Sequence, residues 1–177
     1  MHAPAIPNRI LKEGDIIGLD IGMQYNGYFT DMAVTVGVGK ISPQTQKLLE
    51  VTKEALDLGI KQVKEGNSLS DIALAIQSHA EKNGFAVVRE LVGHGVGKKV
   101  HEEPNVPNFV TDESKLITLK KGITLALEPM INIGGWQVVL KDDNLAYKTA
   151  DDSLSAQFEH TVAIDHNGDV RILTAFE

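Results

Sequence analysis

The sequence contains no cysteine and only one tryptophan among few aromatic residues. Without cysteine the chain forms no disulfide bond, has no thiolate nucleophile and builds no zinc–thiolate site. It has no apolar run of the roughly 18 residues that a membrane-spanning helix requires, and residues 1–10 lack the apolar core of a secretory signal. We therefore expect a cytoplasmic protein without membrane contact, in which oxygen and imidazole groups bind any metal ion.

Positive charge is also scarce. The 17 basic and 24 acidic residues give a net charge of -7, which disfavours direct binding of nucleic acid or anionic membrane through bulk charge. With 42% hydrophobic residues, a chain of 177 residues can bury a substantial core, and its length fits one domain over residues 1–177. The function must therefore be sought in particular acidic residues.

Hydrophobic periodicity predicts an α+β fold. Apolar residues recur at helical spacing over residues 42–66 and 68–84, and each segment begins with a serine cap. Before them, residues 15–39 are typical of two strands joined at Asn26-Gly27. Short runs with β character follow the helices, at residues 85–88, 123–128, 136–140, 157–164 and 170–174. We expect a mixed, largely antiparallel sheet that carries the helices on one face.

Two aspartates interrupt the apolar strands of the expected hairpin. An unpaired carboxylate is costly in such a strand, so Asp20 and Asp31 need compensation. A two-residue loop at Asn26-Gly27 places the two carboxylates diagonally on one face, whereas a loop centred on Tyr25-Asn26 places them directly opposite each other. A three-residue loop without a bulge separates them onto opposite faces. If Asp20 and Asp31 share a face, a cation bound between them explains the paired charges more simply than two exposed acids at the sheet edge.

Two glutamates and two histidines also stand in unusual settings. Glu128 ends one apolar run and Glu159 lies inside another. Either glutamate alone would more often be a surface or ion-paired acid, but four such acids together favour a binding site. His94 lies in GHGVG, whose glycines let the backbone approach a ligand closely, and His101 lies in VHEEP. The more common structural role is assigned to the other internal histidines, which are His79, His160 and His166.

Two aspartates, two glutamates and one histidine form a donor set that suits a pair of divalent ions such as Mn²⁺, Fe²⁺, Co²⁺ or Zn²⁺. The four carboxylates nearly neutralise two dications. Such a pair activates water at neutral pH and stabilises a tetrahedral oxyanion. The residue pattern therefore favours metal-assisted hydrolysis.

Five motifs occur in a fixed order: Asp20, Asp31 eleven residues later, GHGVGKKVHEEP, ALEPM and SLSAQFEHT. Over essentially the whole chain they resemble the type I methionine aminopeptidases, a family of dinuclear metallopeptidases with the pita-bread fold. The resemblance implies a curved sheet with helices on its outer face. It also implies removal of the N-terminal methionine from peptides or nascent proteins, with ribosome association as a further expectation.

The resemblance also assigns roles to residues. It places the ligands of the two divalent ions, which would be Co, Mn, Fe or Zn, at Asp20, Asp31, His94, Glu128 and Glu159. Asp31 and Glu159 would bridge the ions. His101 would contact the substrate and stabilise the tetrahedral intermediate, and His2 would lie near the leaving nitrogen. Glu128 would shuttle protons as well as bind metal.

The chain departs from the family pattern in two respects. Family members continue upstream of the segment that contains His2, so the first half of the fold is expected to be truncated. An apolar sheet face would then be exposed where the missing helices would pack, which predicts a marginally stable monomer or association through that face. In addition, Val100 and about Leu145 stand where the family usually has an aromatic residue and a tryptophan, so the methionine pocket departs from the family pattern.

Two other functions remain open at this point. An Xaa-Pro peptidase would share the fold and the ligands, although the HEEP and EPMIN motifs resemble those of the methionine enzymes more closely. A truncated chain with little activity could instead act as a binding module, since a site can be encoded without being assembled.

Overall fold

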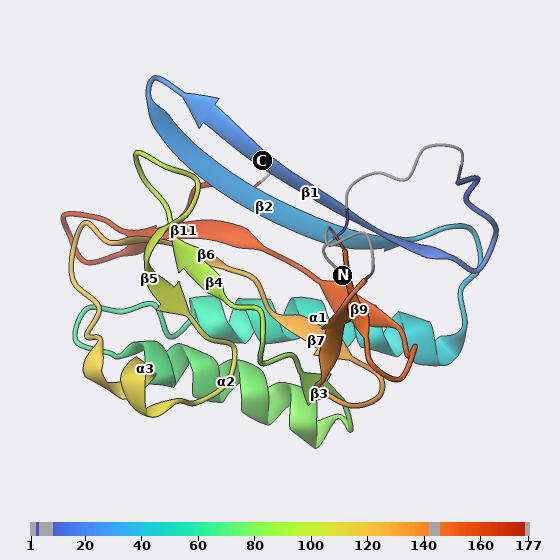
Figure 1. Ribbon diagram of the computed structural model, residues 1–177. Coiled ribbons are helices and arrows are strands. Elements are labelled where there is room, and N and C mark those ends of the chain that lie inside the picture. Colours follow the sequence, from blue (N-terminus) through green and yellow to red (C-terminus); the bar gives the residue numbers. More distant parts are fainter. Residues whose placement is uncertain (1–2, 4–8, 142–145, 176–177) are drawn as a thin grey trace.

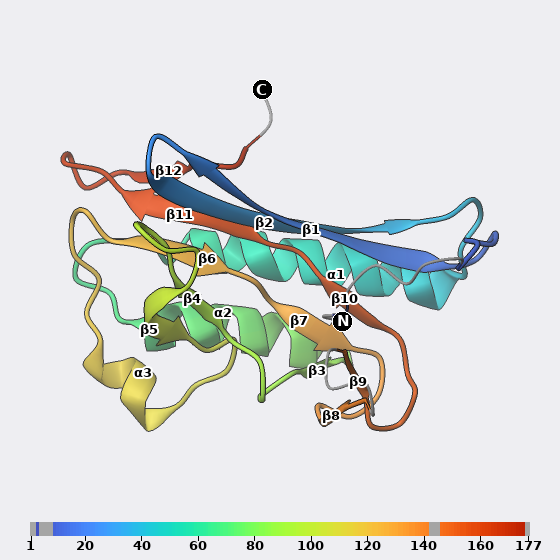
Figure 2. The same ribbon diagram turned by 45° about the horizontal axis from the view of Figure 1, so that its top comes forward.

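The computed structural model describes residue 3, residues 9–141 and residues 146–175. His2 and Leu145 lie outside the described residues. Two helices, α1 and α2, lie side by side along one side of a layer of strands, and the long hairpin β1–β2 runs along the opposite side of that layer (Figure 1). A view turned by 45° shows the same order of layers (Figure 2). Within the described residues, no helix combines the length and apolar character needed to cross a membrane.

The hairpin consists of β1 (Ile16–Tyr25) and β2 (Tyr28–Gly37), which pair antiparallel. Tyr25 pairs with Tyr28, so Asn26 and Gly27 form a two-residue loop. Their φ angles of 48° and 79° are both positive, which such a tight turn between twisted strands requires. Of the loop geometries open to the sequence, the structure therefore selects the two-residue loop.

This loop fixes the register of the two aspartates. Asp20 pairs with Ala33, and Asp31 pairs with Gly22. Because side chains alternate between faces along a strand, this register places both aspartates diagonally on the same face of the hairpin. The expected proximity of the two carboxylates is confirmed.

The two helices begin where their serine caps predict. Helix α1 spans Pro43–Ile60, and the Ser42 hydroxyl accepts the N–H of Thr45. Helix α2 spans Leu69–Lys82. The helix α1 ends at Ile60, before the expected end at residue 66, because the N–H groups of Gln62 and Val63 bond to carbonyls three residues back and so form tighter turns.

The rest of the chain forms short strands and one helical turn. These elements are β3 (Ala86–Val87), β4 (Gly93–Gly95), β5 (Glu102–Val106), α3 (Asp112–Leu116), β6 (Thr124–Leu127), β7 (Met130–Asn132), β8 (Val138–Leu140), β9 (Tyr147–Thr149), β10 (Ser155–Gln157), β11 (His160–Ile164) and β12 (Val170–Ile172). They form three groups in the orders β12-β11-β6-β4-β5, β10-β7-β3 and β8-β9. Every pairing among the described strands is antiparallel.

The expectation of one strand over residues 157–164 is wrong. The segment is divided into β10 and β11, which pair with different neighbours, β7 and β6. Phe158 and Glu159 lie between the two strands. The chain therefore changes partners at Glu159, which is one of the predicted ligands.

Two buried threonine hydroxyls join β2 to residues 157–161. The Oγ1 of Thr161 accepts the N–H of Asp31 at 2.8 Å and donates to the carbonyl of Asp31 at 2.7 Å. The Oγ1 of Thr35 likewise accepts the N–H of Gln157 at 3.0 Å and donates to its carbonyl at 2.7 Å. We call this pair of contacts the threonine clasp. It connects the hairpin to the rest of the structure.

The outer face of the hairpin is apolar and exposed. Its large side chains are between 41% and 72% exposed, namely Leu19, Ile21, Met23, Tyr25, Tyr28 and Val36. Among the described residues, no strand pairs along the outer edge of β1. The expected exposed apolar sheet face is therefore confirmed. The main core lies elsewhere, between the two helices and the short strands.

Candidate metal centre

The five predicted ligands lie on β1, β2 and β4 and in the connections after β6 and β10, and all of them line one cavity. One ligand atom from each residue lies within 4.8 Å of the others in three groups, and two of these consist of predicted ligands alone: His94, Glu128 and Glu159, and Asp20, Asp31 and Glu159. Glu159 belongs to both groups. The cavity has a volume of about 370 Å³ and is lined by Asp20, Gly22, Asp31, His94, Val100, His101, Glu128 and Glu159.

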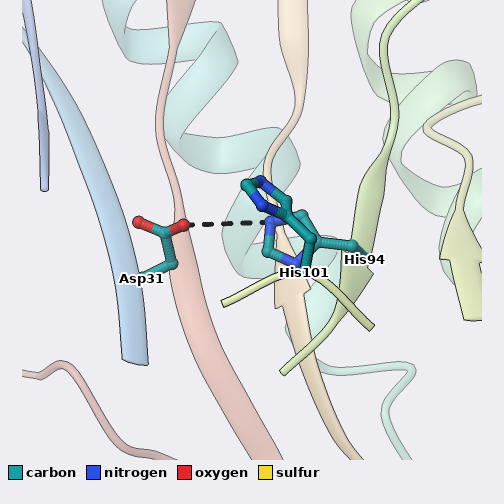
Figure 3. Close-up of side chains that lie close together, drawn as sticks. All are labelled: Asp31, His94 and His101. Carbon is teal, nitrogen blue, oxygen red and sulfur yellow. Dashed lines mark ion pairs between the residues drawn. The ribbon is translucent and has the colours of Figure 1, made fainter. Parts of the chain in front are cut away.

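His94 presents one ring nitrogen to the carboxylates. Its Nδ1 lies 2.9 Å from the carbonyl oxygen of Gly95, which can only accept, so Nδ1 carries the proton. In the neutral ring Nε2 then keeps its lone pair. This atom lies 3.9 Å from Oδ2 of Asp31 (Figure 3) and 3.7 Å from Oε1 of Glu128. A neutral imidazole oriented through its other nitrogen is the usual state of a metal-binding histidine.

Glycines fix the path of the chain around His94. A Cβ on Gly93 would collide with the carbonyl oxygen of Ala126, and a Cβ on Gly95 would collide with that of Glu103. Both neighbours of His94 therefore have to be glycine in this structure. The glycine-rich segment lets β4 lie between β5 and β6, where His94 reaches the cavity.

The carboxylates of the cavity repel one another. Burial is the largest cause that raises the pKa of Glu159, and the charges of Glu128, Asp31 and Asp20 add to it, so that the pKa reaches about 10. Burial and the charge of Asp20 also raise the pKa of Asp31, although His94 partly opposes the shift. The carboxylates therefore favour the binding of a cation between them.

A divalent cation fits the donors that the cavity presents. Among the described residues, Oε1 of the buried Glu159 has no hydrogen-bond partner. Burial of a carboxylate oxygen without a hydrogen-bond partner costs free energy unless a bound ligand, such as a cation, contacts that oxygen. Oxygen donors and one imidazole suit Mn²⁺, Fe²⁺, Co²⁺ or Zn²⁺ better than Ca²⁺.

His101 lies beside the cavity and is exposed. Its ring centre lies 4.2 Å from that of His94 (Figure 3), because the chain turns back after β4 to begin β5. One nitrogen of His101 also lies within 4.8 Å of ligand atoms of Asp31 and His94. The expected contact between His101 and a substrate remains a prediction, and that of His2 falls outside the described residues.

Of the other three described histidines, His79 and His160 have partners away from the cavity, and the structural role expected for His166 stays a prediction. The Nε2 of His79 lies 3.0 Å from Glu54, and the Nδ1 of His160 lies 2.8 Å from Oγ1 of Thr174. Burial lowers the pKa of His160. These contacts fit the structural roles expected for both.

No local pattern in the sequence indicates the role of Gln157. Its Nε2 lies 3.4 Å from Oδ2 of Asp20 and 3.1 Å from Oε2 of Glu128. Its contact with two ligands depends on how β1, β6 and β10 meet, which no local pattern encodes.

The chain is similar to known metallopeptidases. The model of metallopeptidase family M24 matches residues 1–166. The chain is 47% identical to a methionine aminopeptidase of Aquifex aeolicus over 175 residues, which cover 98% of this chain and 67% of that protein. The chain spans about two thirds of the length of the curated relatives that it matches.

Solved structures give the same result. The crystal structure of a methionine aminopeptidase from Thermotoga maritima superposes with a TM-score of 0.91 at 43% identity, covering 97% of this chain and 68% of that one. A prolidase from Thermococcus sibiricus is more distant, with a TM-score of 0.76 and 27% identity over 100% of this chain and 42% of that one. The expected pita-bread fold is confirmed, and the chain belongs to metallopeptidase family M24.

Proposed function

We propose that this chain removes the N-terminal methionine from peptides or nascent proteins by hydrolysis assisted by two divalent ions. The observation that carries the proposal is the meeting of all five predicted ligands at one cavity. The similarity to methionine aminopeptidases over nearly the whole chain supports the choice of substrate.

The two groups of ligands suggest how the ions are held. Asp20, Asp31 and Glu159 would hold one ion, and His94, Glu128 and Glu159 the other. The resemblance to the methionine aminopeptidases would make Asp31, like Glu159, a ligand of both. When bound, the ions supply Lewis-acid polarisation of a carbonyl and lower the pKa of water. The fit of the donors does not select among Co, Mn, Fe and Zn.

The chain's own residues would orient the peptide and move protons. His101, at the open side of the cavity, would donate a hydrogen bond to the carbonyl oxygen of the scissile bond and so stabilise the developing oxyanion. A carboxylate oxygen of Glu128 would accept a proton from the attacking water and deliver it to the leaving nitrogen. Val100 and Gly22 line the same cavity and would contact the substrate's first side chain.

Release of methionine from a short peptide beginning Met-Ala tests the proposal. The protein is first treated with a chelator and then assayed with and without added Mn²⁺ or Co²⁺. We expect methionine release that depends on the added ion. A protein that binds the ion at this site but releases no methionine would contradict the proposal and favour a binding module.

Xaa-Pro peptidase activity is the second candidate, because the prolidase of Thermococcus sibiricus covers the whole chain with the same fold. A peptide beginning Ala-Pro, assayed beside the Met-Ala peptide under the same conditions, separates the two. Higher kcat/KM on the Ala-Pro peptide would reverse the assignment. We expect the Met-Ala peptide to be preferred.

A further inference from the structure

Gln157 lies where the two groups of ligands meet. Its Nε2 contacts Asp20, which belongs to one group, and Glu128, which belongs to the other. One amide nitrogen therefore touches a carboxylate from each proposed ion position. The side chain is 7% exposed, so these contacts lie inside the protein.

The chemistry of an amide suits this position. An –NH₂ group has two hydrogens and can donate one to each of two acceptors. Ionised carboxylates are acceptors only, so the opposite amide orientation would set Oε1 against two negative groups. Hydrogen bonds to charged acceptors are also stronger than those between neutral groups.

The contact with Glu128 also orients that carboxylate. The amide bonds to Oε2, while Oε1 of the same carboxylate faces Nε2 of His94 at 3.7 Å. A bond to one oxygen restricts rotation of the carboxylate about its last torsion, so the other oxygen stays directed toward His94. A ligand held in this way loses less freedom when an ion binds.

The main chain of Gln157 is itself fixed. Thr35 binds both its N–H and its carbonyl through one buried hydroxyl, as half of the threonine clasp. The amide therefore projects from a fixed point on β10, whereas Asp20 and Thr35 belong to the hairpin. The contacts of Gln157 and Thr35 join the same two parts of the protein.

We infer that Gln157 is a positioning residue for the metal centre, whose amide sets the separation and orientation of Asp20 and Glu128, and that Thr35 holds it in place. The inference rests on the proposed binding of two ions. It assigns no contact between Gln157 and the substrate.

Cobalt binding tests this role without an assay of activity. Co²⁺ is titrated into the metal-free protein by calorimetry, and the visible absorption of the bound ion reports its coordination geometry. We expect Gln157→Leu, which keeps the size but removes the amide, to weaken Co²⁺ binding about 10–100-fold, as loss of groups that orient ligands does elsewhere. We also expect a changed absorption spectrum. Gln46→Leu, on the exposed side of α1, is the matched control and should leave both unchanged.

A second pair of variants tests the anchor. Thr35→Val removes the hydroxyl and should weaken Co²⁺ binding in the same direction, whereas Thr35→Ser keeps the hydroxyl and should bind like the parent. This pair also tests the inference if Gln157→Leu does not fold. Melting of each metal-free variant is followed by circular dichroism.

The outcomes distinguish the inference from the proposed function. Co²⁺ affinity and spectrum close to those of the parent in both Gln157→Leu and Thr35→Val would overturn the positioning role and leave the metal site intact. A lower melting temperature with unchanged Co²⁺ binding would overturn it as well, since it would show a structural role alone. Absence of Co²⁺ binding by the parent would overturn both the metal centre and the inference.

Discussion

Glu159 combines deep burial with membership of both ligand groups. It is 2% exposed, it belongs to both ligand groups, and burial together with three other carboxylates raises its pKa. At neutral pH in the metal-free protein it therefore retains a proton. A bound cation would replace that proton.

Replacing Glu159 by glutamine should separate metal binding from stability. The neutral amide imitates the protonated carboxyl, so we expect the melting temperature of metal-free Glu159→Gln to stay the same or to rise. Divalent-ion affinity should fall by more than about 100-fold, because one ligand of both groups is lost, and methionine release should disappear. Calorimetry, thermal melting and the peptide assay measure the three effects. Glu113→Gln, at an exposed position of α3, is the control.

Replacing His101 by alanine should have a different effect. We expect divalent-ion affinity close to that of the parent and kcat lower by roughly 10²-fold or more, since His101 is proposed to stabilise the oxyanion and not to bind the ions. The same calorimetric titration and peptide assay apply. A loss of metal as large as in Glu159→Gln would show that His101 is a ligand, which its distance from Asp31 and His94 also permits.

Metal binding should release protons. The pKa of Glu159 is raised from 4.5 to about 10 by folding, so between these values the folded metal-free protein holds a proton that the unfolded chain has lost. The stability that this group contributes is complete below about pH 4.5 and is lost as the pH rises toward about 10. A cation needs the ionised carboxylate, so its affinity should rise with pH over the same range.

Calorimetry of Mn²⁺ binding at neutral pH, in buffers with different ionisation enthalpies, measures the protons released. We expect roughly one proton per Glu159. A binding enthalpy that does not depend on the buffer would contradict the raised pKa.

At the scale of elements, β4 shows how a short strand can depend on glycine. A Cβ on Gly95 would meet the backbone of β5, which cannot move without breaking the pairing that positions His94. We expect Gly95→Ala to destabilise the protein by roughly 1–3 kcal/mol, the usual cost of overpacking. Urea denaturation measures this free energy. Gly18→Ala, whose Cβ would meet nothing within 4 Å, should change it by less than about 0.5 kcal/mol.

Elements with strong local signals could be predicted from the sequence. Asn26-Gly27 defines the hairpin turn, and the serine caps define where both helices begin. The sequence does not predict the strands β4, β5, β7 and β9, because they are short and β4 is mostly glycine. Pairing with neighbouring strands, and not the pattern of their own side chains, makes these segments strands.

The same distinction holds at the site. The ligands were identifiable because acids in apolar runs are unusual and because their order resembles a known family. Gln157 and Thr35 carry no such signal, since a glutamine and a threonine in strands are ordinary residues. Their contacts appear only when the hairpin meets β10.

At the scale of the whole molecule, the outer face of the hairpin is an apolar surface without a covering layer among the described residues. Exposed contiguous apolar surface favours association. We expect the chain to associate with a second copy through this face, and we expect Ile21→Lys to reduce that association. Sedimentation equilibrium measures it.

Leu116→Lys is the control for this experiment, because Leu116 is also exposed but lies on α3, away from the hairpin. It should leave association unchanged. A parent chain that remains monomeric at high concentration, or equal effects of the two variants, would contradict association through the hairpin.

The threonine clasp has a consequence for the relation between the site and the fold. Asp20 and Asp31 belong to the hairpin, whereas the other three ligands belong to the part that the clasp attaches it to. An ion bound to ligands of both parts therefore stabilises the docking of the hairpin on the rest of the protein. By thermodynamic linkage, docking strengthens the binding of the ion by the same free energy. Each threonine hydroxyl thus contributes to the affinity for the ion through docking, although neither hydroxyl is a proposed ligand. An ion in the cavity would act as a reversible cross-link between the hairpin and the helical half of the chain.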